Sequence, residues 1–219
     1  MIKQLLIKSI VSSFLIGIFV AYSNSNVYSA NKQNIAEANK ESQIAYNELS
    51  KGKTDEAIAS FNKAISLDDK NSPAYVGLGN AYAQKGETDK AIISFNKVIS
   101  LDDKSYPAYV GLGNAHLQKE DETDEAIASF NKAISLDDKS SPAYAGLGNA
   151  YAQKGKTDEA IVCFNKAISL DDKNIYAHYI LGETYLSLDK KDLALEQYNI
   201  LKGLNKDLAR QLYEQIELK

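Results

Sequence analysis

The stretch Tyr75–Asp103 (YVGLGNAYAQKGETDKAIISFNKVISLDD) decides the fold of this chain. Its apolar and small residues have the spacing of two short amphipathic helices joined by a tight turn. The positions that carry this pattern are Tyr75, Leu78, Gly79, Tyr82, Ala91, Phe95, Ile99 and Leu101. Near copies precede and follow the stretch at an almost constant period. One copy cannot bury its own apolar face, so the copies must stack on one another to fold.

The repeats divide most of the chain into five units and a terminal cap helix. We expect the units at residues 38–71, 72–105, 106–140, 141–174 and 175–208, with the cap helix at 209–219. The first unit is degenerate, and the third has one extra residue in the segment Glu120-Asp121-Glu122. Enlarging a turn costs little, whereas an insertion inside a helix would rotate its face, so this segment should be a turn.

Each expected helix has a start signal. The second helix of a unit follows a threonine that precedes an aspartate, at Thr54, Thr88, Thr123 and Thr157. The first helix of the middle units follows Ser72-Pro73, Tyr106-Pro107 or Ser141-Pro142. Hydroxyl side chains cap helix N-termini and proline fits the first turn, so we expect the threonines and serines to be caps.

The repeated Tyr-x-x-Leu-Gly-x-x-Tyr…Ala-x-x-x-Phe pattern resembles the tetratricopeptide repeat, with tyrosine where that family usually has tryptophan. The chain departs from the family at the repeat end, where aspartate replaces proline at Asp69, Asp103, Asp138 and Asp172. The resemblance implies an all-α, right-handed solenoid of helix-turn-helix repeats. It also implies a non-catalytic scaffold whose first helices bind a protein or peptide.

The charge and the cysteine content of the chain exclude some classes of partner and site. The 219 residues are 44% hydrophobic and 25% charged, which is ordinary for a folded protein, and the formal net charge is −4. Lysines alternate with acids and form no basic stripe, so nucleic acid is not expected as a partner. Cys163 is the only cysteine, which excludes an intrachain disulfide and a cysteine-based metal site.

Few residues suggest catalysis. His116 and His178 replace tyrosines at packing positions, and Cys163 replaces a serine. The Asp-Asp-Lys turns lack the Asp-x-Asp-x-Asp-Gly spacing of a calcium loop. We therefore expect structural histidines, no cofactor, no metal and no enzymatic activity, while an intermolecular disulfide through Cys163 stays open.

The N-terminus predicts export. Lys3 and Lys8 precede the 13-residue apolar run Ile10–Tyr22, and small residues follow up to Ala30. This order is typical of a secretory signal peptide at residues 1–30, followed by a linker at 31–37. The expected location is the periplasm, the cell surface or the medium. The alternative is an uncleaved anchor that tethers the protein to the inner membrane through residues 1–30.

The resemblance places a peptide-binding groove on the first helices. Its expected lining residues are Val76, Asn80, Gln84, Val110, Asn114, Gln118, Ala145, Asn149, Gln153, Tyr179 and Glu183, with small residues at Gly77, Gly111 and Gly146. Amides donate and accept hydrogen bonds, so rows of Asn and Gln can pair with an extended peptide backbone. The alternative is that duplication copied these amides as scaffold.

The end units break the amide rows, with Ser42 and Tyr46 in the first unit and Tyr179, Glu183 and Ser187 in the fifth. Selectivity is therefore expected at the ends. The groove positions hold no Lys or Arg, so binding of acidic chaperone tails is not expected. The leading hypothesis is a protein-interaction scaffold, and the alternative is a structural protein of the cell envelope that self-associates, which makes a homo-oligomer possible.

Overall fold

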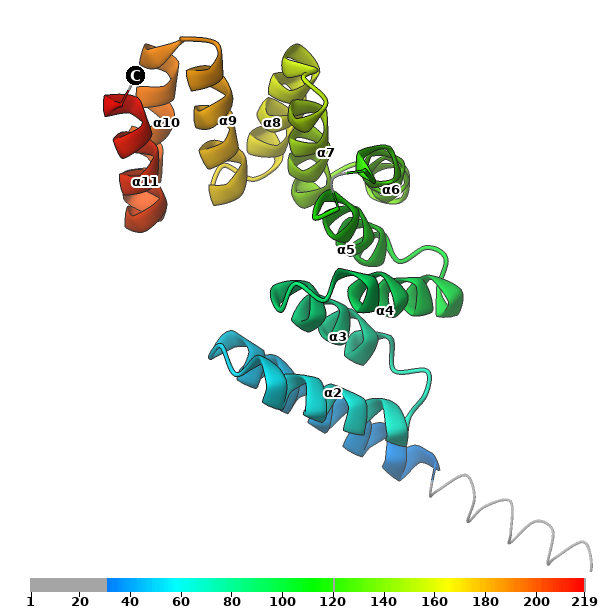
Figure 1. Ribbon diagram of the computed structural model, residues 1–219. Helices are drawn as coiled ribbons and strands as arrows, with labels where there is room; N and C mark the ends of the chain where they lie inside the picture. The colour runs from blue at the N-terminus through cyan, green and yellow to red at the C-terminus, as the bar shows by residue number, and fades with distance from the viewer. Residues whose placement is uncertain (1–30, 120, 219) are drawn as a thin grey trace, which may run out of the picture. The chain divides into compact units, whose positions relative to one another are not determined.

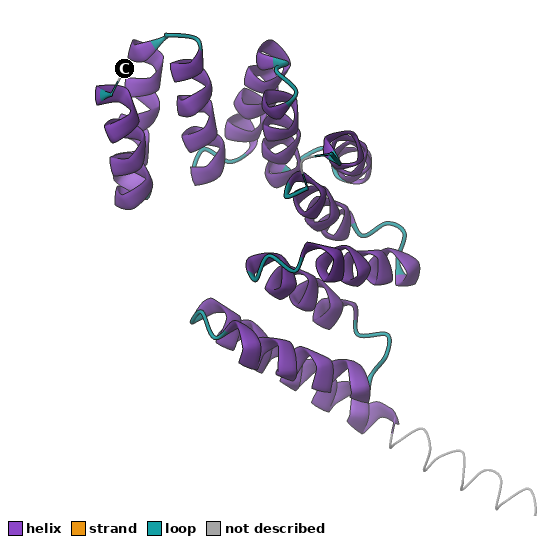
Figure 2. Ribbon diagram, in the orientation of Figure 1, coloured by secondary structure: helices purple, strands orange, loops and turns teal. Residues whose placement is uncertain are grey.

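The computed structural model describes residues 31–119 and 121–218 (Figure 1). All regular structure in these residues is helical (Figure 2). The chain divides between Gly77 and Leu78 into two compact units, which we call the first and the second unit, and the five sequence units are called repeats. The expected signal segment, residues 1–30, lies outside the described residues. Within the described part, no helix is both long and apolar enough to cross a membrane.

The helices follow one another as pairs. Residues 31–50 are helical, and after them come α2 (Thr54–Leu67), α3 (Ser72–Gln84), α4 (Thr88–Leu101), α5 (Tyr106–Leu117), α6 (Thr123–Leu136), α7 (Ser141–Gln153), α8 (Thr157–Leu170), α9 (Ile175–Ser187), α10 (Lys191–Leu204) and α11 (Lys206–Glu217). The second helices α2, α4, α6 and α8 start at the threonines that the sequence predicts. Residues 121–122 lie in the turn before α6, where the extra residue of the third repeat was expected.

Two expectations at the ends were wrong. Residues 31–37, expected as a linker, are helical, because they contain no Gly or Pro and are rich in helix-forming Lys, Gln, Ala and Glu. The cap helix was expected from residue 209 but begins at Lys206. The side chain of Asn205 accepts hydrogen bonds from the backbone N–H groups of Asp207 and Leu208, both at 3.1 Å, which fixes this earlier start.

The caps also differ from the expectation. No side chain caps the N-termini of α2, α4, α6 and α8, because their threonines already lie inside the helix. In the first helices the cap lies one residue earlier than expected. Asn71 Oδ1 accepts from Ala74 N at 3.0 Å, and Asn174 Oδ1 accepts from Ala177 N at 2.9 Å. Ser140 has the equivalent place before α7 and makes no such bond.

Phenylalanines of the second helices hold the repeats together. In the second unit, Phe95 of α4 lies between Gly79 of α3 and Gly111 of α5. A Cβ atom at Gly79 would lie 2.8 Å from Phe95 Cζ, and one at Gly111 would lie 2.5 Å from the same atom. Gly79 is therefore small because two helices cross closely there, as the sequence predicts.

The second set of glycines has a packing role that the sequence did not predict. Gly111 and Gly146 were expected only as small residues of the groove, and they also receive the rings of Phe95 and Phe130 from the preceding repeat. In the first unit, Gly77 receives the ring of Phe61 in the same way. These glycines are needed so that a large side chain can pass between consecutive repeats.

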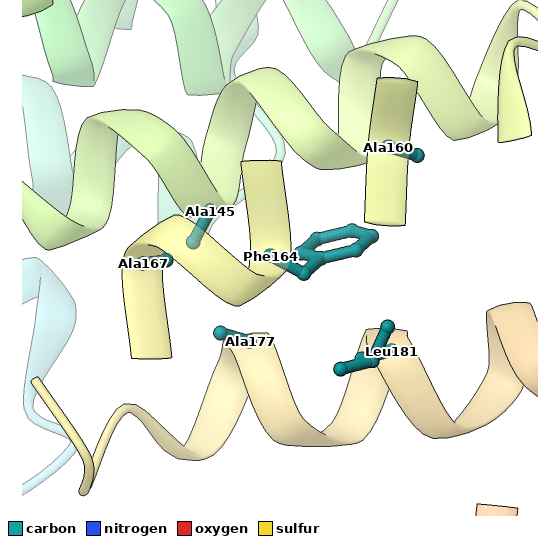
Figure 3. Packing of buried hydrophobic residues seen from close by; sticks show 6 residues of the cluster. All are labelled: Ala145, Ala160, Phe164, Ala167, Ala177 and Leu181. Carbon is teal, nitrogen blue, oxygen red and sulfur yellow. The ribbon is translucent and has the colours of Figure 1, made fainter. Parts of the chain in front are cut away.

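Figure 3 shows the next layer of the second unit, where the ring of Phe164 on α8 lies between α7 and α9. Ala145 of α7 and Ala177 and Leu181 of α9 pack against it. Burying a phenylalanine side chain contributes about 2 kcal/mol. Small residues on the neighbouring helices let each ring contact two first helices at once.

First helices form the inner layer of the second unit. Contacts link α5 with α7, α7 with α9, and α9 with α11. For the part of the unit that the structure describes, no comparable contact links α4 with α6, α6 with α8, or α8 with α10. The first helices are thus closer together than the second ones, so their shared surface is the concave side on which a groove can form.

Candidate functional site

A hollow of about 560 Å³ lies on the inner layer of the second unit, and we call it the amide hollow. It is lined by Asn114, Leu117, Gln118, Pro142, Ala145, Gly146, Asn149, Gln153, Asn174 and Tyr176. These residues come from α5 and α7 and from the start of α9 with its cap. The volume is in the range of small-ligand and peptide sites.

Six of the expected groove positions line this hollow. They are Asn114, Gln118, Ala145, Gly146, Asn149 and Gln153. Ala145 is only 2% exposed, so its side chain belongs mainly to the core. Val110 is half-buried against Phe130 and Leu147 and does not line the hollow. Asn80 and Gln84 are exposed on α3 outside the hollow, and Val76 belongs to the first unit.

The two asparagines of the hollow differ in their hydrogen bonds. Asn149 Nδ2 donates to the phenol oxygen of Tyr176 at 2.5 Å. Tyr176 stands at the start of α9, where α7 has Pro142 and α5 has Pro107. A proline offers no side-chain acceptor, and Asn114 has no side-chain hydrogen bond to any described residue. Asn114 is exposed and free to bind a ligand.

The two glutamines differ in the same way. Gln118 Oε1 accepts a hydrogen bond from Thr88 Oγ1 of the preceding repeat at 3.0 Å. Gln153 is exposed, lines the hollow and has no side-chain partner in the described part of the chain. Two of the four amides therefore fit the scaffold alternative, and the other two fit the ligand-binding one. Asn149 and Gln118 connect repeats, whereas Asn114 and Gln153 are available.

Tyr179 and Glu183 lie beyond the hollow, against the cap helix. Gln215 of α11 donates its side-chain N–H to Glu183 Oε1 at 2.8 Å, and its Nε2 lies 3.2 Å from the phenol oxygen of Tyr179. Burial and the nearby Glu183 carboxylate both raise the pKa of Tyr179. They also raise the pKa of Tyr176, against a lowering effect of the Asn149 hydrogen bond.

The sequence reasoning missed Tyr176, Asn174 and Pro142 as lining residues. A signal for Tyr176 was present, because it replaces the proline that starts the first helices of the middle repeats. Sequence spacing identifies the exposed face of a helix. It does not show that the start of the next helix closes one side of the hollow.

The residues of the first repeat that were expected to supply selectivity make hydrogen bonds within the protein. Ser42 is 4% exposed, and its hydroxyl donates to the carbonyl of Ala38 at 2.9 Å, so the expectation that it faces a ligand was wrong. Tyr46 donates its phenol O–H to the carbonyl of Pro73 at 2.7 Å and packs edge-on against Phe61. Both residues stabilise the first unit.

The histidines make structural contacts, as the sequence predicts. His178 is buried, with Nδ1 at 2.8 Å from Gln197 Oε1 and Nε2 at 3.1 Å from the carbonyl of Asp172. His116 Nδ1 lies 2.6 Å from Glu122 Oε2. These contacts use both ring nitrogens of His178 and one of His116.

Cys163 and the Asp-Asp-Lys turns also have local explanations. Cys163 is 8% exposed, and burial together with the Glu159 charge raises the pKa of its thiol to about 11, which makes it a poor nucleophile. The first aspartate of each pair accepts the backbone N–H of the lysine two residues later, at 3.0 to 3.1 Å. These aspartates form Asx turns, as expected for solvated turns.

A second hollow of about 270 Å³ lies between α10 and α11, and unlike the uncharged amide hollow it has basic residues in its lining. Tyr198, Lys202, Lys206, Ala209, Arg210 and Tyr213 line it. The Lys202 ammonium lies 5.3 Å from the ring centroid of Tyr198, and the two tyrosine rings are 4.9 Å apart. This hollow contains none of the amide positions, so it is separate from the groove.

Family models match the helix pairs. A TPR repeat model matches residues 46–86, 79–120 and 148–189, and two tetratricopeptide repeat models match residues 106–140 and 129–162. Together these matches run without a gap from residue 46 to residue 189, which is well over half of the chain. No curated protein matches the sequence.

Solved structures share the fold. TTC0263, a thermophilic TPR protein of Thermus thermophilus, is 19% identical with a TM-score of 0.76, and the alignment covers 82% of this chain and 98% of that chain. MamA is 30% identical with a TM-score of 0.58 over 76% of this chain and 97% of that one. YrrB, described as a TPR protein with an unusual peptide-binding site, is 26% identical with a TM-score of 0.55 over 84% and 97%. The chain is an all-α solenoid and belongs to the tetratricopeptide-repeat family.

Proposed function

We propose that this protein is a non-catalytic interaction scaffold that binds an extended peptide segment of a partner protein in the amide hollow. The observation that carries the proposal is the pair of unpaired amides, Asn114 and Gln153, that lines a hollow on the inner layer. An amide donates and accepts at once, so it can pair with a peptide N–H and C=O without demanding a particular side chain.

The small residues that line the hollow leave room for a peptide backbone. Ala145 and Gly146 line the hollow with small side chains, and a Cβ at Gly146 would collide with the ring of Phe130. Protein binding is common for the family, and YrrB is described with a peptide-binding site. The peptide preference of this chain is our proposal.

The test uses a double variant, Asn114→Ala with Gln153→Ala. We expect it to lose captured partner, while its helicity and melting midpoint by circular dichroism stay within error of the wild type. A matched control is Asn131→Ala with Asn165→Ala, which removes two exposed amides from the second helices α6 and α8. Affinity capture from the native cell envelope followed by mass spectrometry reads the result. Equal recovery by all three proteins would overturn the proposal.

The alternative of end-to-end self-association has less support. Apart from Tyr213, the outward residues of α11 are polar or charged, including Arg210, Gln211 and Glu214, and such a face solvates the end of a repeat array. Light scattering at high concentration separates the two ideas. A stable oligomer would favour the structural role. A monomer would exclude self-association and would be consistent with the binding role.

We also propose that the protein is exported by residues 1–30 and acts in the periplasm, at the cell surface or outside the cell. The support is the order of charged, apolar and small residues in this segment. Intact mass of the native protein tests the proposal. Loss of the segment indicates cleavage, its retention in a membrane fraction indicates an anchor, and its retention in the cytoplasmic fraction would contradict export.

A further inference from the structure

The asparagine row of the groove ends in a carboxylate. Asn114 in α5, Asn149 in α7 and Glu183 in α9 occupy equivalent positions of consecutive repeats. α5, α7 and α9 are neighbours in the inner layer of the second unit, so these three residues follow one another along the groove. A ligand that crosses the two amides therefore next meets the only acid of the row.

Glu183 lacks a cationic partner in the described part of the chain. Its Oε1 accepts a neutral amide hydrogen bond from Gln215 at 2.8 Å. Two other glutamates that are at least partly buried do have lysines: Glu41 pairs with Lys63, and Glu122 with Lys119, both at 2.5 Å. A half-buried carboxylate without a cation gains more from an incoming positive charge than a solvated one does.

Tyr179 shares Gln215 with this carboxylate, and Tyr176 lies near enough for its charge to act on it. Burial raises the pKa of both Tyr176 and Tyr179, and the charge of Glu183 raises each pKa further. Tyr176 also lines the amide hollow and accepts the hydrogen bond of Asn149. Aromatic rings attract ammonium and guanidinium groups, so the tyrosines and the carboxylate favour the same ligand charge.

We infer that the groove selects peptide segments with a lysine or arginine whose side chain docks against Glu183 beside Tyr176 and Tyr179. The inference rests on the proposed peptide-binding function. Packed helices are about 8–10 Å apart, and an extended chain advances about 3.3 Å per residue. The basic residue should therefore lie roughly three positions from the residue over Asn149 and six from the residue over Asn114.

The experiment selects ligands without knowing the partner. A phage-displayed library of random dodecapeptides is panned on the immobilised chain, and selected peptides are synthesised with the basic residue kept or changed to Gln. We expect selected sequences to be enriched in Lys or Arg. Changing that residue to Gln, or Glu183→Gln in the protein, should each weaken binding about tenfold, and the two changes together should cost little more than one.

Controls separate a local contact from general charge. Glu196→Gln removes an exposed acid on α10 and should leave the affinity unchanged. Melting by circular dichroism checks that Glu183→Gln is folded. The Lys preference should weaken as salt rises, because the contact is only partly buried.

The outcomes distinguish the two proposals. If no peptide is enriched, or if enriched peptides bind the Asn114→Ala and Gln153→Ala double variant as well as the wild type, the proposed function fails. If enriched peptides need these amides but carry no basic residue, or bind Glu183→Gln equally well, the peptide-binding function stands and the inference about Glu183 is overturned.

Discussion

The side-chain amide of Asn149 donates a hydrogen bond to the phenol oxygen of Tyr176 at 2.5 Å and so links the first helices of the fourth and fifth repeats. The same asparagine one repeat earlier, Asn114, faces the proline-start of α7 and has no such link among the described residues. Two identical residues at equivalent positions therefore have different roles. One stabilises the array, and the other is free to bind a ligand.

This difference predicts unequal stability effects. Asn149→Ala should lower the free energy of unfolding by about 1 kcal/mol, because a hydrogen bond between two repeats is lost. Asn114→Ala should change it by less than about 0.5 kcal/mol. Tyr176→Phe keeps the ring and removes only the phenol oxygen, so combining it with Asn149→Ala should add little to either change. Urea unfolding of all four proteins measures this, and fully additive effects would contradict the bond.

Glycine at position 111 should be essential for packing. Gly111→Ala places a Cβ 2.5 Å from Phe95 Cζ, and we expect a loss of about 1–3 kcal/mol from the displaced ring. Gly203 is the matched control because its Cβ would meet no atom within 4 Å, so Gly203→Ala should stabilise α10 by up to about 1 kcal/mol. Thermal unfolding compares them, and a gain for both would show that the Phe95 contact is wrong.

Removing the ring itself should be worse. Phe95→Ala leaves a cavity between three helices, and the expected cost is about 3–5 kcal/mol. The melting midpoint by circular dichroism should fall clearly. An unchanged midpoint would contradict the placement of Phe95 between Gly79 and Gly111.

A missing cap offers a stabilising substitution. Ser140 Oγ is buried without a hydrogen-bond partner among the described residues, whereas Asn174 at the equivalent position caps Ala177 N at 2.9 Å. Ser140→Asn should therefore raise the free energy of unfolding by about 0.5–1 kcal/mol. Asn174→Ser is the reciprocal change and should lower it. Denaturant titration checks both signs, and a loss in both variants would argue against the cap.

Cys163 should react slowly while the protein is folded. Its thiol has a pKa of about 11 against an ordinary 9.0, because burial and the Glu159 charge disfavour the thiolate. A shift of two pKa units lowers the thiolate fraction at pH 8 by about 100-fold. Labelling by a thiol reagent should be slower by at least that factor in buffer than in guanidinium, and should accelerate as pH rises towards 11. Equal rates would show an accessible thiol.

Much of the fold could be predicted from the sequence, because apolar spacing and small residues report directly on helix faces. The starts of α2, α4, α6 and α8 and the close crossing at Gly79 are examples. The threonine caps and the linker at 31–37 were predicted wrongly, and the contact of Gly111 with Phe95 was not predicted. Capping depends on a single residue of register, and the Gly111 contact involves a phenylalanine from another repeat.

The candidate site could be predicted only in part. The sequence identified Asn114, Gln118, Asn149 and Gln153 from their repetition, but repetition gives all copies the same status. Only the structure separates them, because Tyr176 and Thr88 reach two of these amides and leave the other two free.

By itself the sequence determined the family, the helix pairs and the face that points into the groove. These follow from local periodicity, since the helix period fixes which side chains share a face. The tertiary structure decided which of these residues bond to other repeats, and that Glu183 has an amide but no cationic partner among the described residues. Those properties depend on contacts between repeats about 30 residues apart, and no pattern within one repeat contains them.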